Sequence, residues 1–392
     1  MGPKTRFELR KSHTCVTMND VFSGTSLGLE RYQQMKFSRG IALIAPCVLS
    51  TAAHAVWSVT NLHPANALTS VAWSVRGAQQ AGVIRDSNTA LSKASLWTGT
   101  AGSWVDLNPV SALVSGAAAT DGTQQVGEVR LLSNPGQDRA SVWSGTAASW
   151  TDLHPLLATR SLARAVSAGM QAGSAEIGGA FHAGTWTGTA ASWNDINPGA
   201  AAYSFLHGID GINQVGEANV AGQDHASIWS NTAGSWVDMH PGGASNSYGF
   251  FANSGQQVGY AVVGGQNRAS LWTGSSASWM DLTPGASPDS IAYGVLGGTQ
   301  VGYASVAGQD HASVWSGTAG SWVDIHDANF LSTRAYSIWS DANFTYISGY
   351  GVDANTNMTN ALLWTQPVPE PGTLIVLGLG ALALMRRRSA KK

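Results

Sequence analysis

The sequence predicts an all-β protein, a seven-bladed β-propeller of four-stranded blades, and three observations carry this prediction. Tryptophans occur in pairs seven residues apart, and from Trp143 to Trp315 the first member of each pair returns every 43 residues. A Gln-x-Gly tripeptide recurs with a similar period. The chain holds 46 Gly and 16 Trp with only 11% charged residues, which is typical of short strands joined by tight turns. A fixed period of this length indicates a repeat architecture.

The predicted ring is acidic, and the basic residues gather at the two ends of the chain. Residues 56–368 contain 9 Lys and Arg against 19 Asp and Glu, and 9 − 19 gives a charge of −10. Nucleic-acid binding needs a basic surface, so this composition argues against it. Cys15 and Cys47 both precede the repeats, so the ring is expected to fold without disulfides.

Residues 35–55 have the three parts of a secretory signal peptide. Lys36 and Arg39 form the basic region, Ile41 to Leu49 the apolar run, and Ala53-His54-Ala55 the cleavage site between small residues. Signal peptides stand at the N-terminus, so Met35 is interpreted as the true start and residues 1–34 as a misannotated upstream extension. The alternative is a real extension that precedes an internal signal.

Residues 56–366 hold the repeats, and each repeat is expected to form one blade of four short strands. In the repeat that contains Trp229 and Trp236, Gly, Asn or Asp separates the four β-prone pieces, as tight turns require. These pieces are Tyr203–Gly208, Gln214–Asn219, His225–Ser230 and Ser235–Met239.

The number of Gln-x-Gly pieces predicts the number of blades. Six are regular and a seventh is degenerate: they begin at Gln80, Gln125, Gln171, Gln214, Gln257, Gln300 and Tyr346. The last repeat lacks its outer strand, and Val59 to Pro64 at the start of the ring resembles the missing piece. The N-terminal strand is therefore expected to complete the last blade, which closes the ring and removes both open sheet edges.

Residues 367–392 have a different composition. Pro367 to Gly372 is expected to break any strand and to stay apart from the last blade. Thr373 to Met385 is an apolar run of 13 residues, which is short for a membrane span of about 20. The cluster Arg386, Arg387 and Arg388 would hold the C-terminus in the cytoplasm.

The order of Pro369-Glu370-Pro371, an apolar run and an arginine cluster resembles the PEP-CTERM sorting signal. The same segment is also labelled an ice-binding protein C-terminal domain. The resemblance implies a Gram-negative bacterium whose exosortase recognises the Pro-Glu-Pro motif and removes the anchor, and it implies an association with exopolysaccharide. The repeats themselves resemble HAF-type extracellular repeats, with Ser in place of Phe in His311-Ala312-Ser313, and this likeness implies no reaction.

Positions that repeat in every unit are interpreted as structural. The tryptophans could be platforms for sugars, but their regular recurrence favours blade packing. The Asp two residues after the second Trp is expected to make turn and backbone hydrogen bonds. The repeat histidines His225 and His311 are likewise interpreted as structural. Asp353-x-Asn355-x-Asn357 resembles the start of a calcium loop but lacks its Gly and Glu, so a plain turn is favoured. No metal site, cofactor or catalytic residue is predicted.

Positions that vary between repeats are better candidates for ligand contact. The residue after Gln-x-Gly changes from blade to blade, and Glu128, Glu217, Tyr260 and Tyr303 at this position are the predicted ligand surface. Glu128 and Glu217 lie two blades apart, which is too far for the carboxylate pair of a glycoside hydrolase, at about 5–9.5 Å.

These interpretations predict a non-catalytic protein of the cell surface or extracellular matrix, associated with exopolysaccharide or biofilm. It would be exported by the Sec machinery, held briefly in the inner membrane, and processed by exosortase. Two alternatives stay open: a hydrolase or lyase acting on extracellular glycans on a propeller scaffold, and an ice- or surface-adhesion protein.

Overall fold

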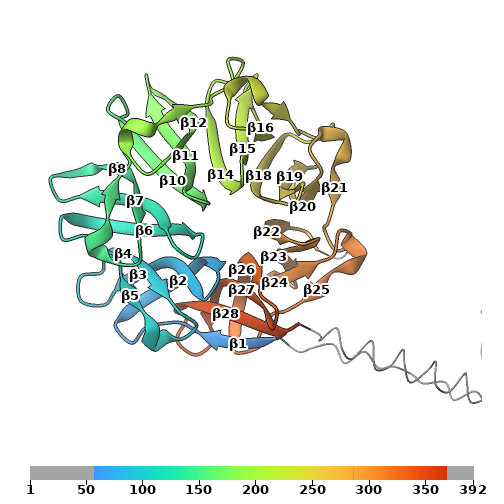
Figure 1. The fold of residues 1–392 in the computed structure, drawn as a ribbon. Coiled ribbons are helices and arrows are strands. Elements are labelled where there is room, and N and C mark those ends of the chain that lie inside the picture. Colours follow the sequence, from blue (N-terminus) through green and yellow to red (C-terminus); the bar gives the residue numbers. More distant parts are fainter. Residues whose placement is uncertain (1–56, 286, 369–392) are drawn as a thin grey trace, which may run out of the picture. The chain divides into compact units, whose positions relative to one another are not determined.

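The computed structural model describes residues 57–285 and 287–368, which form a closed ring of seven four-stranded sheets (Figure 1). The predicted seven-bladed, all-β propeller is thereby confirmed. The predictions for residues 1–34, for the signal peptide at 35–55 and for the C-terminal membrane helix lie outside the described residues. Within the described part of the chain, no helix has the length and apolar character needed to cross a membrane.

Each blade begins at the centre of the ring and ends at its rim (Figure 1). The innermost strands are β2 (Ala67–Arg76), β6 (Ala112–Thr120), β10 (Arg160–Ser167), β14 (Ser204–Asp210), β18 (Asn246–Asn253), β22 (Ser290–Leu296) and β26 (Phe330–Ser340). The second strands are β3 (Gln79–Asp86), β7 (Gln125–Leu131), β11 (Met170–Ile177), β15 (Asn213–Val220), β19 (Gln256–Val263), β23 (Thr299–Val306) and β27 (Phe344–Asp353). The third strands are β4 (Ser92–Trp97), β8 (Asn134–Trp143), β12 (Ala180–Trp186), β16 (Gln223–Trp229), β20 (Gln266–Trp272), β24 (Gln309–Trp315) and β28 (Thr359–Pro367).

The outermost strands are shorter than the sequence suggested. The piece Ser235–Met239 contains only a two-residue strand, because Ser235 still belongs to a 3₁₀ turn that lets Trp236 fold back onto the blade. The outer strands are β5 (Val105–Asp106), β9 (Thr151–Asp152), β13 (Asn194–Asp195), β17 (Val237–Asp238), β21 (Met280–Asp281), β25 (Val323–Asp324) and β1 (Ser58–Asn61). The 3₁₀ turns are η1 (Ala101–Ser103), η2 (Ala147–Ser149), η3 (Ala190–Ser192), η4 (Ala233–Ser235), η5 (Ser276–Ser278) and η6 (Ala319–Ser321).

The two ends of the described chain close the ring, as predicted. β1 pairs antiparallel with β28, with Ser58 opposite Thr365 and Asn61 opposite Leu362. Leu62 follows β1, is fully buried, and donates its N–H to the carbonyl of Ala361. The N-terminal strand thus supplies the fourth strand of blade 7.

One prediction about the C-terminal side was wrong. Pro367 and Val368 belong to the last blade: Pro367 pairs with Phe344 in β27, and the Val368 N–H donates to the carbonyl of Asn343 at 2.8 Å. Since the Val368 N–H points toward β27, the nitrogen of Pro367 points toward the opposite edge of β28. A proline is tolerated in this strand because its nitrogen is not required as a donor to β27.

The first tryptophan of each pair is a core residue. All seven are fully buried: Trp97, Trp143, Trp186, Trp229, Trp272, Trp315 and Trp364. Trp229, for example, packs in one cluster with Leu206 of its own blade and with Ala183 and Ile196 of the preceding blade. Burying a side chain of this size stabilises the fold by about 2–3 kcal/mol, so the tryptophans hold neighbouring blades together.

The second tryptophan of each pair covers the outer part of its blade. In the regular blades its indole N–H donates to a serine of the third strand, as Trp236 does to the Ser227 hydroxyl at 2.9 Å. Blade 3 differs because Gly184 stands where this serine would be. The Trp193 ring occupies the space that a Cβ at Gly184 would need and lies 4.6 Å from Trp186, between ring centroids.

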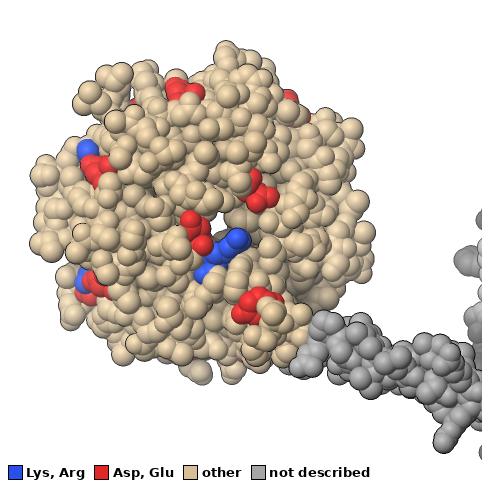
Figure 2. Space-filling view, viewed as in Figure 1, with Lys and Arg blue, Asp and Glu red and all other residues tan. Residues whose placement is uncertain are grey.

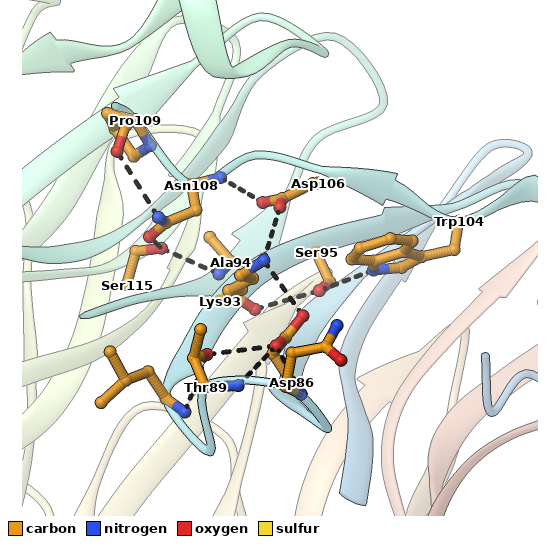
Figure 3. A network of polar contacts seen from close by, with 12 residues as sticks. Asp86, Thr89, Lys93, Ala94, Ser95, Trp104, Asp106, Asn108, Pro109 and Ser115 are labelled. Atoms are coloured by element: carbon orange, nitrogen blue, oxygen red, sulfur yellow. Dashed lines mark hydrogen bonds and ion pairs between the residues drawn. The ribbon is translucent and has the colours of Figure 1, made fainter. Parts of the chain in front are cut away.

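A polar contact that we call the inter-blade clip joins each blade to the next (Figure 3). A backbone N–H on one blade donates to a hydroxyl on the innermost strand of the following blade. The seven pairs are Ala94–Ser115, Ala140–Ser161, Ala183–Ser204, Ala226–Ser247, Ala269–Ser290, Ala312–Thr333 and Ala361–Ser70. The last pair crosses the closure, so blade 7 is clipped to blade 1 like any other neighbour.

The Gln-x-Gly tripeptide is explained by two local requirements. The Gln214 side-chain oxygen accepts the Asn231 N–H at 2.7 Å and so fixes the turn after Trp229. Gly216 lies against the innermost strand so closely that a Cβ there would overlap the carbonyl oxygen of Phe205. The close approach accompanies a β-bulge at His207 in the innermost strand, and the same bulge recurs in every blade.

Candidate functional site

The β-bulge places one side chain of each blade beside the axis of the ring. Near the middle of each innermost strand, one residue has no partner in the register with the second strand, and it lies nine residues before the glycine of Gln-x-Gly in six of the blades. We call this set the bulge ring: Trp73, Ala118, Arg164, His207, Phe250, Tyr293 and Tyr336. The strands β2, β6 and β26 have a second unpaired residue near their start, which is not counted here.

All seven residues of the bulge ring line an axial cavity of about 540 Å³. From the ring the lining continues to the hairpins between the first and second strands, at residues such as Arg76, Asp121 and Asp210. Cavities that bind small organic ligands measure about 300–1,000 Å³. Figure 2 shows an opening at the centre of the molecule, with charged side chains of both signs beside it.

Four consecutive blades contribute an aromatic surface to this cavity, which we call the aromatic arc: His207, Phe250, Tyr293 and Tyr336. The rings touch in sequence, with centroid distances of 5.4, 5.1 and 4.9 Å. Burial raises the pKa of Tyr293 to about 12, so its hydroxyl stays protonated and can donate a hydrogen bond at neutral pH. The arc therefore offers flat apolar faces with polar edges.

The remaining bulge residues, from blades 1 to 3, differ in kind from the arc. They are the indole of Trp73, the small Ala118, and Arg164, whose guanidinium lies 3.3 Å from the carboxylate of Glu128. The cavity thus has an aromatic side and a side with one cation paired to an anion.

The predicted ligand residues lie behind the cavity and support the arc. Tyr260 is 5.7 Å from Phe250, and Tyr303 is 6.2 Å from Tyr293, between ring centroids. Glu217 is buried, and its carboxylate lies 2.7 Å from the imidazole nitrogen Nε2 of His207, without the alignment of a hydrogen bond. None of these side chains lines the cavity itself.

The predicted residue Glu128 sits in the same second layer. Burial raises the pKa of its carboxyl group, and the positive charge of Arg164 acts in the opposite direction. Glu128 pairs with Arg164 of blade 3, whereas Glu217 pairs with His207 of its own blade. The structure therefore gives the two carboxylates separate partners in separate blades.

A polar layer of carboxylates fixes the tyrosines and the arginine of the second layer. Asp310 accepts a hydrogen bond from Arg334 Nε at 2.8 Å and forms an ion pair with its Nη2 at 2.6 Å, and the guanidinium lies 4.2 Å above the Tyr303 ring. The Tyr303 hydroxyl donates to Asp289 at 2.7 Å.

Asp224 holds the equivalent place in blade 4. It accepts bonds from the hydroxyls of Tyr203 and Tyr248, each at 2.7 Å, and from Asn219. Burial opposes its ionisation, but these hydrogen bonds hold the pKa of Asp224 below its usual value. A rigid second layer of this kind pre-orients the side chains that meet a ligand.

The repeat aspartates have the contacts expected of structural residues. Asp238 accepts the His240 N–H through one oxygen and lies 2.8 Å from His225 Nδ1 through the other. Asp324 does the same with His326 and His311. Asp353 accepts two backbone N–H groups of its own turn, from Asn355 and Thr356. Among the residues that the structure describes, no group of three or more His, Cys, Asp and Glu could hold a metal ion.

The bulge ring escaped the sequence prediction, although a signal for it exists. The column nine residues before the repeat glycine reads Trp, Ala, Arg, His, Phe and Tyr in the first six blades, which is the kind of variation expected of a ligand surface. The prediction used the column just after Gln-x-Gly, which lies one strand further from the axis. The sequence repeat alone does not show which of these two variable positions, the one nine residues before the glycine or the one just after it, faces the cavity.

Comparison with protein families gives a match at the C-terminus. Residues 367–389 match the PEP-CTERM protein-sorting motif. No curated protein matches the chain in sequence.

Solved structures match the ring. The ring is similar to a puromycin hydrolase mutant, with a TM-score of 0.52 and 9% identity, over 74% of this chain and 53% of that chain. It is similar to oligogalacturonate lyase in complex with manganese, with a TM-score of 0.51 and 9% identity, over 80% of this chain and 97% of that chain. The β-propeller domain of the Trilobed protease from Pyrococcus furiosus, reported to have an open velcro topology, gives a TM-score of 0.50 at 9% identity, over 77% of this chain and 98% of that chain. At such identities the likeness shows the propeller fold alone.

Proposed function

We propose that this chain is a non-catalytic binding protein that is exported, sorted to the cell surface or matrix, and engages extracellular polysaccharide in its axial cavity. Export would use the Sec machinery, and the sorting signal at Pro369-Glu370-Pro371 would be processed by exosortase during a transient stay in the inner membrane. Support for sorting comes from the match of residues 367–389 to the PEP-CTERM motif, which implies export and exosortase processing.

The observation that carries the binding proposal is the aromatic arc at the axis. The apolar C–H faces of sugar rings pack against aromatic faces, while the hydroxyl groups around the sugar find donors and acceptors at the edges. A cavity of about 540 Å³ has room for one or two sugar units at the end of a chain. Both charges of the nearby Arg164–Glu128 pair are compensated, which favours a neutral or weakly charged glycan.

A binding role is favoured over a catalytic one because the carboxylates that line the cavity are already engaged. They are Asp121, which accepts backbone N–H groups of Thr123 and Gln124, and Asp210, which accepts the N–H of Ser254. Glycoside hydrolysis needs two carboxyl groups free to act on one bond. In this cavity both acidic side chains hold hairpins in place.

The binding proposal is tested with the fragment 57–368 on a glycan array and on isolated extracellular polysaccharides. Phe250→Ala and Tyr293→Ala should each weaken retention by about tenfold, as expected for removal of a stacking ring. Phe344→Ala is the matched control, since Phe344 is an aromatic residue 40% exposed on blade 7 and outside the cavity. Equal binding by all three variants would contradict the axial site.

The sorting proposal has its own test. Alanine substitution of Pro369, Glu370 and Pro371 should leave the ring folded but keep the protein in the inner membrane. Mass spectrometry of the surface or released form should find a C-terminus that lacks Arg386, Arg387 and Arg388. A released protein that still carries these arginines would contradict processing by exosortase.

A further inference from the structure

Both ends of the ring emerge at one face, on blade 7. Ser58, at the start of β1, pairs with Thr365 near the end of β28. Two residues further on, Pro367 pairs with Phe344, the first residue of β27. The chain therefore enters and leaves the ring beside the hairpin that joins β26 to β27.

This hairpin is longer than its counterparts. The bulge residue and the repeat glycine are nine residues apart in the other blades, as from Tyr293 to Gly302, but 13 apart in blade 7, from Tyr336 to Gly349. The four extra residues lie between Trp339 and Tyr346, which pair in the positions of Leu296 and Thr299 of blade 6. They add one further pair, Ser340 with Thr345, and a turn that is two residues longer, so the tip projects beyond those of the other blades. The projection stands on the same face as the hairpins of the other six blades, because it joins the same two strands.

Three aromatic side chains gather at the end of this hairpin. Trp339 and Tyr346 stack across the two strands with centroids 5.5 Å apart, and Phe344 lies 6.1 Å from Tyr346, nearer the tip. The lower part of this column is partly buried against blade 1, whereas Phe344 is 40% exposed. We call residues 339–346 the blade 7 hairpin.

Only a short stretch of chain links the blade 7 hairpin to the apolar C-terminal run. Val368 is hydrogen-bonded to Asn343 in this hairpin, and the apolar run begins at Thr373. Five residue steps span at most about 18 Å even when fully extended. Whatever surface the apolar run enters must therefore come within that distance of the hairpin.

We propose that the blade 7 hairpin rests in the headgroup region of a phospholipid bilayer while the apolar run is inserted, with Phe344 and the Trp339–Tyr346 stack as the interfacial contact. Tryptophan and tyrosine favour the interface because they combine an apolar ring with a polar edge. The inference rests on the proposed function, since it requires residues 373–385 to enter the membrane. It adds an orientation: the face with the blade 7 hairpin meets the membrane, and the opposite face points away.

The test uses the full chain in vesicles of phosphatidylcholine and phosphatidylglycerol that carry a headgroup-linked fluorescence quencher. Cys15→Ser and Cys47→Ser remove the two native thiols, so a single fluorophore can be attached at a chosen site. Ala342→Cys places it at the tip of the blade 7 hairpin. Ile212→Cys, at the exposed tip of the blade 4 hairpin on the same face, and Ser133→Cys, on the opposite face, are matched controls.

The label at position 342 should be quenched about twofold more than the label at 212, with the label at 133 unquenched, since interfacial contacts reach only about 5–10 Å into the bilayer. Adding Phe344→Ser should reduce quenching at 342 and leave the other labels unchanged. If the chain floats with the vesicles but the labels at 342 and 133 are quenched equally, the proposed contact of the blade 7 hairpin with the membrane is wrong, while anchoring by the apolar run stands. If the chain does not float with the vesicles, both the anchoring and the hairpin contact are wrong.

Discussion

The periphery and the axis of the ring obey different rules. At the periphery every blade has a buried tryptophan and a clip to the next blade, and six of the seven blades have a glutamine that fixes a turn. At the axis the bulge ring shares its backbone geometry in all blades but carries six different residue types. Stability at the rim depends on contacts that each blade must make, whereas the axis leaves its side chains free to match a ligand. Repetition therefore indicates packing, and variation within a repeated backbone indicates recognition.

The largest effect on the periphery is expected from deleting Val59 to Pro64. This removes most of β1, the fully buried Leu62, and the His63 contact to Ser70, so blade 7 loses its outer strand. The loss should be about 5 kcal/mol or more, because a core residue and an entire strand pairing disappear together. Thermal melting measures it, and a deletion of residues 1–34 is the control. Unchanged melting would show that closure is dispensable.

A single peripheral tryptophan should matter more than a single axial aromatic residue. Trp229→Ala is expected to lower the free energy of unfolding by about 3–5 kcal/mol, since Trp229 is fully buried. Phe250→Ala, on the axis and only half-buried, should cost about 1–2 kcal/mol. Denaturant unfolding of both variants compares the two regions. If Trp229→Ala melts like the native protein and loses glycan binding, the tryptophans are ligand platforms.

The clips should make the periphery sensitive to pH. In four of the clips the hydroxyl also contacts Nδ1 of a histidine. The pairs are Ser70 with His63, Ser161 with His154, Ser247 with His240, and Thr333 with His326. The hydroxyl accepts the backbone N–H and donates to Nδ1, so the neutral ring is required. Burial lowers the pKa of all four histidines from 6.5.

The direction in which pH changes the stability of the ring follows from proton binding. The unfolded chain binds more protons than the folded ring below the unfolded pKa, so the stabilisation is present above pH 6.5 and is lost as the pH falls below it. The melting temperature should therefore drop between about pH 7.5 and pH 5.5. Substituting the four histidines by Asn should flatten this dependence, because Asn108 and Asn197 make the same contact in blades 1 and 3. An unaltered pH dependence in this variant would assign it to other groups.

The smallest effect on stability is expected at the axis, from Tyr293→Phe. Among the described residues the Tyr293 hydroxyl has no hydrogen-bond partner, and its ring contacts stay in the variant, so the free energy of unfolding should change by no more than about 0.5 kcal/mol. Polysaccharide binding should nevertheless weaken, because the hydroxyl is available to a ligand. Calorimetric titration separates the two quantities. A stability loss as large as that of a core residue would contradict the division between rim and axis.

The outer architecture could be predicted because each of its parts has a fixed residue type at a fixed spacing. The core is marked by Trp229, the turn by Gln214 and the close strand contact by Gly216. Because the last repeat lacks an outer strand, the sequence also predicted that β1 completes blade 7. The bulge at His207 left no such mark, because backbone geometry rather than residue type creates it. Tyr260 and Tyr303, which were predicted to meet a ligand, lie one layer behind the cavity, against Phe250 and Tyr293 of the aromatic arc. The resemblance of the repeats to HAF-type repeats, and the ice-binding label of the C-terminal segment, stay predictions.

The pairing of β1 with β28 also determines when the ring can finish folding. Ser58 is made early and its partner Thr365 late, so the ring cannot finish until almost its whole length is available. A chain that crosses a membrane from its N-terminus would wait with its first strand unpaired and the apolar face of blade 1 uncovered. Contacts between such distant segments form slowly, and unpaired edges invite association with other chains. Blade 7 can therefore be completed only after the chain has been delivered as far as β28, and only then would the axial cavity be enclosed on all sides.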